Sequence, residues 1–346
     1  MSVSPGQPLC HDRTVFVVIT NYRTPKDTEE TILSLKASSY PDIHICVVDN
    51  DSRDGSVDYL RSRFADITLI EAPANEGVAR AYNRGIKQAL KENAGYILIL
   101  NSDVELDHHC VRRLVDRAGD PDRPVMLAPV MYYYGEREKV WFAGGRIIWD
   151  EGGWAHCETV EEFRKLPAQD RFITACAMFI TRKTVDITGY YDERYFMYWD
   201  DTDYSVSATQ AGVDLDMVGD AVLYHKISAS SGGVQDFIRP FHAYEILRSS
   251  MIFWRKHLGF WKFHRMWCAG HLGKWVNDLP IWWSDPARRP SAEAVMNAFW
   301  YYFTFRRDPL TRPTCPAWLR YFLRNRPWVV AELMAFRCPF KRPFVN

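Results

Sequence analysis

The chain has 346 residues, of which 47% are hydrophobic and 25% are charged, and its basic and acidic residues are equal in number. This composition is typical of a globular protein that is large enough for one enzyme-sized domain and an extension. No apolar stretch approaches the roughly 20 residues that span a bilayer, and residues 1–12 lack a secretory apolar core. The eight cysteines include no Cys-x-x-Cys pair and no zinc spacing, so we expect reduced thiols in a cytoplasmic protein, with Cys46 and Cys176 in the core.

Strands and helices alternate along the first hundred residues. Buried strands are predicted from apolar runs at 15–20, 44–48, 67–70 and 96–100. Helices are predicted from the spacing of apolar residues at 28–37, from residue 56, and around 79–86. This alternation predicts an α/β fold whose mostly parallel sheet is flanked by helices. Ligands collect at the carboxyl ends of such strands, where four polar residues fall, namely Thr20, Asp49, Asn75 and Asp103.

An acidic and aromatic segment occupies residues 195–204. Its carboxylates Asp200, Asp201 and Asp203 stand at the predicted start of a helix that runs through residue 208. One interpretation is a solvated first turn, which the helix dipole stabilises. The other is that the helix start points the carboxylates in different directions, so that Asp201 faces a ligand while Asp203 caps the helix or pairs with a basic side chain. A later strand, at 221–224, leads directly to His225.

Short motifs follow these elements in a defined order and spacing. They are 19–22 (Ile-Thr-Asn-Tyr), 47–50 (Val-Val-Asp-Asn) with Ser52 and 54–56 (Asp-Gly-Ser), Asn75-x-Gly77 with Ala79, Ala81 and Asn83, 101–103 (Asn-Ser-Asp), 174–178 (Thr-Ala-Cys-Ala-Met), 199–204 (Trp-Asp-Asp-Thr-Asp-Tyr), and His225. Over roughly residues 14–235 this set resembles the family 2 glycosyltransferases, which have the nucleotide-binding A-type transferase fold. The Asn-Tyr and Asp-Asn variants are most similar to the rhamnosyltransferase branch, and Trp-Asp-Asp is similar to bacterial galactofuranosyltransferases.

The resemblance implies an inverting, metal-dependent glycosyltransferase. Asp103 and His225 match the family's metal-ligand positions, and Mg²⁺ or Mn²⁺ there would compensate the charge of the leaving diphosphate. Asp201 matches the base that removes the proton of the acceptor hydroxyl. One attacking group and one base imply a single displacement with inversion.

The nucleotide site is expected at the carboxyl ends of the strands. Gly77 would permit close backbone approach near the diphosphate. The predicted nucleotide contacts are Thr20, Tyr22, Asp49, Asn50, Asn75, Gly77, Asn83 and Ser102. Asn50 replaces an acid that many members carry, so dTDP-linked and UDP-linked donors both remain open, with rhamnose or a galactofuranose-like sugar as the transferred group.

Two other functions are compatible with these residues. A sugar-nucleotide nucleotidyltransferase would share the layered sheet, but it needs a Gly-rich phosphate loop, and residues 20–26 contain no glycine. A non-catalytic glycan-binding relative would have lost the carboxylates that Asp103 and Asp201 provide. Trp154 and Trp199 are candidate sugar platforms, although large aromatic residues near a cleft are more often part of the core.

Charge divides the chain into a catalytic domain, 1–237, and a helical extension, 238–346. The first has 25 basic and 37 acidic residues, whereas the second has 18 and 6 and holds nine of the 13 tryptophans. Basic and aromatic residues interleave at 255–267, which favours peripheral contact with an anionic membrane on its inner face; a packing module or dimer interface is the alternative. The acidic first domain argues against nucleic-acid binding. The expected partners are a nucleoside-diphosphate sugar and a glycan or lipid-linked acceptor. Prolines 280, 286 and 290 predict a break in the extension.

Overall fold

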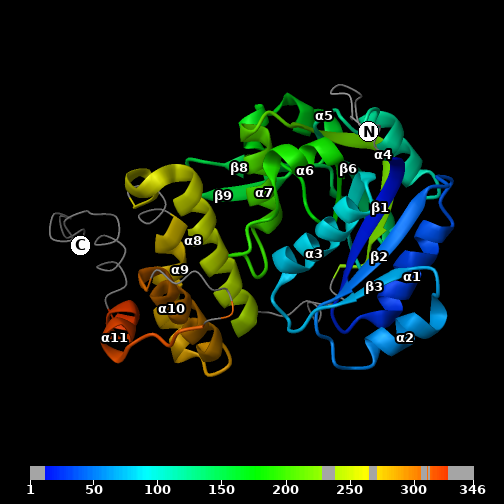
Figure 1. Cartoon of the computed structure of the whole chain (residues 1–346). Coiled ribbons are helices and arrows are strands. Elements are labelled where there is room, and N and C mark those ends of the chain that lie inside the picture. The colour runs from blue at the N-terminus through cyan, green and yellow to red at the C-terminus, as the bar shows by residue number, and fades with distance from the viewer. Residues whose placement is uncertain (1–11, 228–237, 265–270, 305–309, 311, 326–346) are drawn as a thin grey trace, which may run out of the picture.

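A computed structural model describes residues 12–227, 238–264, 271–304, 310 and 312–325 (Figure 1). The strands of the large sheet are β1 (Asp12–Asn21), β2 (Ile43–Asp49), β3 (Thr68–Glu71), β4 (Ala94–Asn101), β5 (Val104–Leu106), β6 (Val125–Tyr133), β7 (Glu136–Phe142), β11 (Ala177–Thr181) and β12 (Asp214–His225). Among the described residues they form a nine-stranded sheet in the order β3-β2-β1-β4-β11-β6-β12-β5, with β7 paired to β6. A separate three-stranded sheet consists of β10 (Arg171–Phe172), β8 (Gly145–Ile148) and β9 (Gly153–His156), in that order.

Helices cover both faces of the large sheet. They are α1 (Pro25–Lys36), α2 (Ser56–Arg63), α3 (Val78–Lys91), α4 (Cys110–Ala118), α5 (Val160–Lys165), α6 (Arg182–Thr188) and α7 (Asp200–Gln210). Figure 1 shows α3 on one side of strands β1 to β3, and α1 and α2 on the other. The apolar runs of β1, β2 and β4 are buried because both faces of the sheet are covered. The predicted α/β fold with flanking helices is therefore confirmed.

The direction of the strands changes across the sheet. β1 pairs in parallel with β2 and β4, and β2 pairs in parallel with β3. β11 then runs antiparallel between β4 and β6, and β12 is parallel to β6. In the parallel half, Thr20 lies beside Val48 on one strand and Asn101 on the other. The carboxyl ends of β1, β2 and β4 thus meet at one edge of the sheet.

The described part of the extension is helical, as predicted. Its helices are α8 (Pro240–Lys262), α9 (His271–Ser284), α10 (Arg289–Phe303) and α11 (Ala317–Asn325). The predicted break falls between α9 and α10, although Pro280 lies inside α9. Figure 1 shows α8 between α7 and the other three helices. No helix in the described ranges is long and apolar enough to cross a membrane.

Candidate active site

Asp103 and His225 lie side by side at the end of the sheet. β4 ends at Asn101 and β5 begins at Val104, so Asp103 occupies the turn between them. His225 is the last residue of β12 and pairs in register with Val104. Oδ1 of Asp103 is therefore 3.2 Å from Nε2 of His225, and both side chains are buried. Two segments that are far apart in the sequence thus form one carboxylate–imidazole pair, the candidate metal site. This pair of side chains, Asp103 and His225, is called the metal pair below.

The electrostatics of this pair favour a positive charge. Burial alone would lower the pKa of His225, but Cys176 and the Asp103 carboxylate act in the opposite direction and raise this pKa to about 10. One nitrogen of the imidazole also lacks a hydrogen bond. Nδ1 of His225 is buried and has no hydrogen-bond partner in the described structure. A divalent cation would supply the positive charge that the surroundings favour.

The residues present fit a Mg²⁺ or Mn²⁺ ion. Carboxylate oxygen and imidazole nitrogen are ordinary ligands of such ions. Neighbouring ligands around an octahedral ion with bonds of about 2.1 Å lie about 3 Å apart, close to the 3.2 Å between Asp103 and His225. Within the described residues, no group of three or more His, Cys, Asp or Glu side chains converges on a metal position. Water and phosphate oxygens would complete the coordination, as Mg²⁺ commonly requires.

Asp201 reaches the same region from the start of α7. Its Oδ2 accepts a hydrogen bond from Ala175 N at 3.1 Å, and its Oδ1 accepts one from Thr202 N at 2.7 Å. Ala175 directly precedes Cys176, whose carbonyl oxygen accepts a hydrogen bond from Asn101 N at 3.0 Å, two residues before Asp103. The carboxylate is half-buried. Its orientation is thus fixed by backbone N–H groups next to the metal pair.

The first turn of α7 is buried, so of the two interpretations the solvated turn does not apply. Asp200 is 6% exposed and Asp203 is 2% exposed. Burial, together with the charge of Asp201, raises the pKa of Asp200 well above its usual value and favours its neutral form. Asp203 accepts hydrogen bonds from Lys256 Nζ at 2.7 Å and His257 Nε2 at 2.8 Å. The pairing predicted for Asp203 is present, and the turn is dry because α8 covers it.

α8 also supports the residues that lead into α7. Tyr198 and Trp199 have φ angles of 66° and 64°, a left-handed conformation that is unfavourable for bulky side chains. The Trp199 ring packs against Phe253 and Trp254, at centroid distances of 4.8 and 5.5 Å. Tyr198 Oη lies 2.5 Å from His242 Nδ1. Trp199 is therefore a core residue that fixes the start of α7, and it is not an exposed sugar platform.

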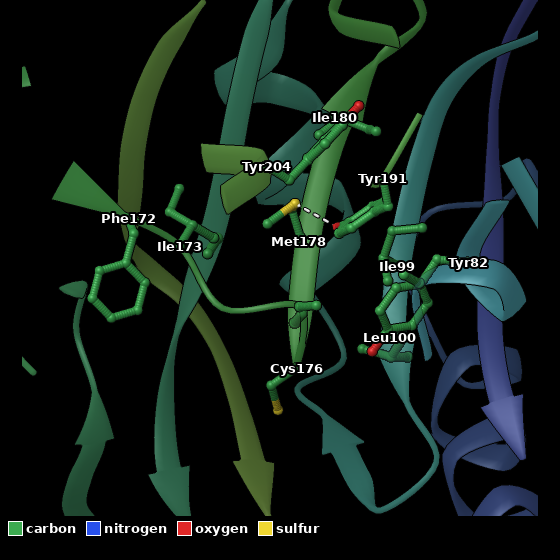
Figure 2. Close-up of a cluster of buried hydrophobic side chains, with 14 of the residues drawn as sticks. Tyr82, Ile99, Leu100, Phe172, Ile173, Cys176, Met178, Ile180, Tyr191 and Tyr204 are labelled. Carbon is green, nitrogen blue, oxygen red and sulfur yellow. Dashed lines mark hydrogen bonds between the residues drawn. The ribbon is translucent and has the colours of Figure 1, made fainter. Parts of the chain in front are cut away.

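A buried cluster joins α7 to β11 and α3 behind the site. Figure 2 shows Tyr191 between Tyr82 and Tyr204, with Met178 of β11 beside it. The rings of Tyr191 and Tyr204 stack at 4.2 Å with an interplanar angle of 11°. The Tyr191 hydroxyl lies 3.0 Å from Met178 Sδ. In the same view Cys176 stands at the start of the strand, below this cluster, and it is buried as predicted.

The polar residues after β2 hold one another in place. The Asp49 carboxylate accepts hydrogen bonds from Asn21 Nδ2 at 2.6 Å and from N and Oγ of Ser52 at 2.9 and 2.6 Å. Nδ2 of Asn50 donates to Asn75 Oδ1 at 3.0 Å. These bonds join the ends of β1 and β2 to the loop before α3. The structure thus brings Asp49, Asn50 and Asn75 together at the predicted edge.

Gly77 is required by a contact within the protein. Its φ is 90°, and a Cβ atom there would lie 2.4 Å from the carbonyl oxygen and 2.6 Å from the Cα of Phe196. That same carbonyl accepts a hydrogen bond from Val78 N at 2.8 Å. The close approach of another backbone to Gly77 is therefore that of Phe196, and the expected approach of a diphosphate stays a prediction.

The other predicted nucleotide residues occupy different positions. Thr20 is half-buried and Tyr22 is 39% exposed at the end of β1. Ser102 Oγ is 3.0 Å from Thr24 Oγ1, in the turn that carries Asp103. Asn83 lies within α3, where its buried amide exchanges two hydrogen bonds of 2.9 Å with the backbone of Tyr191. The structure therefore places Asn83 apart from the other predicted contacts, in a position that holds the segment around Tyr191.

Two residues of the site were not predicted. Trp141 of β7 packs edge-on against His225 at a centroid distance of 4.4 Å. The same ring contacts His156 of β9 at 5.6 Å. Burial lowers the pKa of His156, while the Trp141 carbonyl and the Asp201 carboxylate act in the opposite direction. The Trp141 ring thus connects His156 to the candidate metal ligand His225. β7 and β9 are largely exposed strands, and they lack the apolar runs by which the other strands were predicted.

Known proteins share the fold and the sequence pattern. The chain is 24% identical over 274 residues to the N-acetylglucosaminyl-diphospho-decaprenol L-rhamnosyltransferase of Mycobacterium tuberculosis, covering 72% of this chain and 87% of that protein. It is 22% identical over 265 residues to the dTDP-rhamnosyl transferase RfbF of Shigella flexneri, covering 70% and 80%. The mannosyltransferase PcManGT of Pyrobaculum calidifontis, solved with GDP-Man and Mn²⁺, superposes with a TM-score of 0.51 and 15% identity, over 95% of this chain and 90% of that one.

The sheet with helices on both faces is the fold of the A-type glycosyltransferases. Residues 16–187 match the family described as Glycosyl transferase family 2. The chain therefore carries a domain of this family, is a glycosyltransferase, and is similar to the rhamnosyltransferase branch. This assignment favours the transferase over the nucleotidyltransferase and the non-catalytic glycan-binding protein.

Proposed function

We propose that this glycosyltransferase moves a rhamnose or galactofuranose-like sugar from a dTDP-linked or UDP-linked donor to a glycan or lipid-linked oligosaccharide, with inversion. The observation that carries the proposal is the buried pair of Asp103 and His225, 3.2 Å apart, with Asp201 beside it. The activities for which the two relatives are named support a dTDP-rhamnose donor and a lipid-diphosphate acceptor. The Mn²⁺ in the mannosyltransferase complex supports the use of a divalent metal.

In this proposal each residue of the site has its own chemical role. Asp103 and His225 would hold Mg²⁺ or Mn²⁺, which when bound compensates the negative charge of the leaving diphosphate. Asp201 accepts the proton of the attacking hydroxyl, and the N–H of Ala175 fixes the direction of its carboxylate. A single base that acts with one attacking oxygen inverts the anomeric centre.

The nucleotide lies, in this proposal, along the edge formed by Thr20, Tyr22, Asp49, Asn50, Asn75, Gly77 and Ser102. A carboxylate has about four lone-pair positions, and Asp49 uses three of them within the protein. The remaining acceptor position suits the imide N–H of uracil or thymine. Asn83 contributes indirectly, because its hydrogen bonds to Tyr191 hold the segment that approaches Gly77.

The metal site gives the first prediction. Asp103→Ala and His225→Ala should weaken the metal-dependent binding of dTDP or UDP by at least about 10-fold, because each removes a ligand of the ion that binds the diphosphate. Isothermal titration with nucleoside diphosphate, with Mn²⁺ and then with chelator, measures this. Glu105→Gln is the matched control, since Glu105 is a nearby carboxylate whose ion-pair partner is the half-exposed Arg137. Equal nucleotide affinity with Mn²⁺ and with chelator would rule out the metal role.

The proposed inversion is tested separately, by NMR of the anomeric configuration of the product.

We also propose that the extension brings the enzyme to an anionic membrane surface on the cytoplasmic side, where a lipid-linked acceptor would be reached. α11 supports this, because Trp318 and Tyr321 on its outer face are 60% and 61% exposed. Arg320 and Arg324 lie on the same helix. Aromatic residues together with basic residues on one helix suit the interface of an anionic bilayer.

A further inference from the structure

Three aromatic side chains, Trp141, His156 and Trp154, form a strip that extends from His225 to the surface. Trp141 contacts His225 at a centroid distance of 4.4 Å and His156 at 5.6 Å. His156 in turn stacks on Trp154, at 5.1 Å with an interplanar angle of 25°. Trp154 is 50% exposed, although it is a large apolar ring. The strip starts at a buried candidate metal ligand and ends at an open aromatic surface.

His156 offers a hydrogen-bond acceptor in this strip. Its Nδ1 lies 3.2 Å from the carbonyl oxygen of Trp141. A carbonyl only accepts, so Nδ1 carries the proton. The neutral imidazole then has a lone pair on Nε2. Burial lowers the pKa of His156 and so favours this neutral form. His156 therefore pairs an aromatic face with an acceptor for a hydroxyl group.

We propose that Trp154 and His156 form the subsite for the acceptor sugar of the transfer reaction. In this subsite the apolar C–H face of a sugar ring lies on the indole of Trp154, and a ring hydroxyl donates a hydrogen bond to His156 Nε2. A sugar has both of these groups, whereas an acyl chain has no hydroxyl to donate. The inference rests on the proposed function, because it takes the acceptor to be a glycan.

The placement of the strip suits this role. Trp141 connects His156 to the candidate metal ligand His225, and Asp201 is bonded to Ala175, beside the same pair. In this proposal an acceptor on Trp154 presents its hydroxyl to Asp201, and the donor diphosphate lies at Asp103. Trp154 and His156 lie on the same face of β9, since they are two residues apart on a strand. Their relative position is set by the small sheet and does not depend on a loop.

The subsite is tested by sugar binding rather than by turnover. Saturation-transfer NMR is recorded with a panel of methyl glycosides of glucose, galactose, mannose, N-acetylglucosamine and rhamnose, in the presence of dTDP and Mn²⁺. At least one glycoside should receive saturation through its C–H face. Trp154→Ala should weaken its binding by about 2- to 10-fold, the range measured for aromatic contacts. Trp154→Phe should restore most of the binding, because it keeps an aromatic face.

Two further variants sharpen the test. His156→Phe keeps the ring stacked on Trp154 but removes Nε2, so it should weaken binding while the C–H contact to Trp154 persists. Trp318→Ala removes a similarly exposed tryptophan from α11 and should leave glycoside binding unchanged. If no glycoside shows saturation that depends on Trp154, the subsite is wrong. Titration with dTDP or UDP separates this result from a failure of the proposed function, since a protein that binds neither nucleotide is not the proposed transferase.

Discussion

Three carboxylates within one helical turn have different surroundings in this protein. Asp203 is held by hydrogen bonds from Lys256 and His257. Asp200 is buried, and its raised pKa favours the neutral acid. Asp201 is half-buried, and backbone N–H groups orient its carboxylate. The difference arises because α8 covers one side of the turn while the other side faces the metal pair. Only Asp201 is placed to receive a proton from a substrate.

This difference predicts a large loss of turnover for one substitution and little change for its neighbour. Asp201→Asn should lower turnover by at least about 100-fold, because an amide keeps the shape but cannot accept the proton. Asp200→Asn replaces an acid that is already neutral, so turnover should stay within about 10-fold of the wild type. Nucleoside diphosphate release with and without acceptor measures both. Near wild-type turnover of Asp201→Asn would show that another group is the base.

At the scale of elements, Asp216 ties two helices to β12. Its carboxylate accepts hydrogen bonds from Arg164 Nε of α5 at 2.9 Å and from Arg117 Nε of α4 at 3.2 Å. Burial alone would raise the pKa of Asp216, but these two arginines outweigh it and lower the pKa below its usual value. The ionised form therefore stabilises the fold at pH values above about 4, the ordinary pKa. That contribution is lost as the pH falls through the lower pKa of the folded state.

We expect Asp216→Asn to lower the free energy of unfolding by about 1.5–3 kcal/mol at pH 7, the range for hydrogen bonds to charged groups. The difference from the wild type should shrink near pH 3, because the wild-type carboxylate begins to protonate there. Urea unfolding at the two pH values measures the effect. Asp220→Asn is the control, since Asp220 lies on the same strand with its side chain 74% exposed. A deficit that is equal at both pH values would contradict the ionic origin.

The contact between α8 and α7 gives a second prediction at this scale. Lys256→Met combined with His257→Phe removes both hydrogen-bond partners from Asp203 but keeps the ring that packs on Phe253. The start of α7 should then loosen, and kcat should fall between about 10- and 100-fold through misplacement of Asp201. Binding of nucleoside diphosphate should not change. Faster amide exchange at 200–204 would accompany the loss, and Lys262→Met on the same helix serves as control. Unchanged kcat would show that α8 does not position the base.

Local patterns were enough to predict the elements of the parallel half. The strands there are apolar runs buried on both faces, and polar residues at their ends share one edge because parallel strands point the same way. Trp141 and His156 could not be found in this way, because they lie on exposed strands without apolar periodicity. The burial of Asp200 was also not predictable, since it depends on a helix some 50 residues further along the chain. Contacts between distant segments decided each of these cases.

At the scale of the whole molecule, the catalytic domain and the extension have net charges of opposite sign, which suggests that only the extension contacts an anionic surface. The first 237 residues are acidic and the remainder is basic. The alternative, that the extension is a packing module, applies to α8, because α8 packs on the first domain through Phe253 and Trp254. The exposed aromatic residues of α11 are not explained by that packing. Together with Trp261 of α8, which is 64% exposed, they are the described residues to which we assign the proposed membrane role.

Flotation with liposomes tests this role. Binding of the full-length protein should increase with the fraction of anionic lipid and fall only partly in high salt, because salt screens the basic residues but not buried aromatic rings. Combined alanine substitution of Trp318, Tyr321 and Phe322 should remove the part that persists in salt. Trp154→Ala, which removes an exposed tryptophan of the first domain, should bind like the wild type. A wild-type protein that stays in the soluble fraction at every lipid composition would assign α11 to contact with another protein surface.

The contact between Gly77 and Phe196 has a consequence for the evolution of this fold. The atoms of Phe196 that occupy the space beside Gly77 are its carbonyl oxygen, Cα and carbonyl carbon, all of which belong to the backbone. Every amino acid has these atoms, so no replacement at position 196 can make room for a side chain at position 77. Homologues that keep this loop should therefore have glycine at position 77 whatever residue stands at 196, and the two positions should show no covariation although they touch.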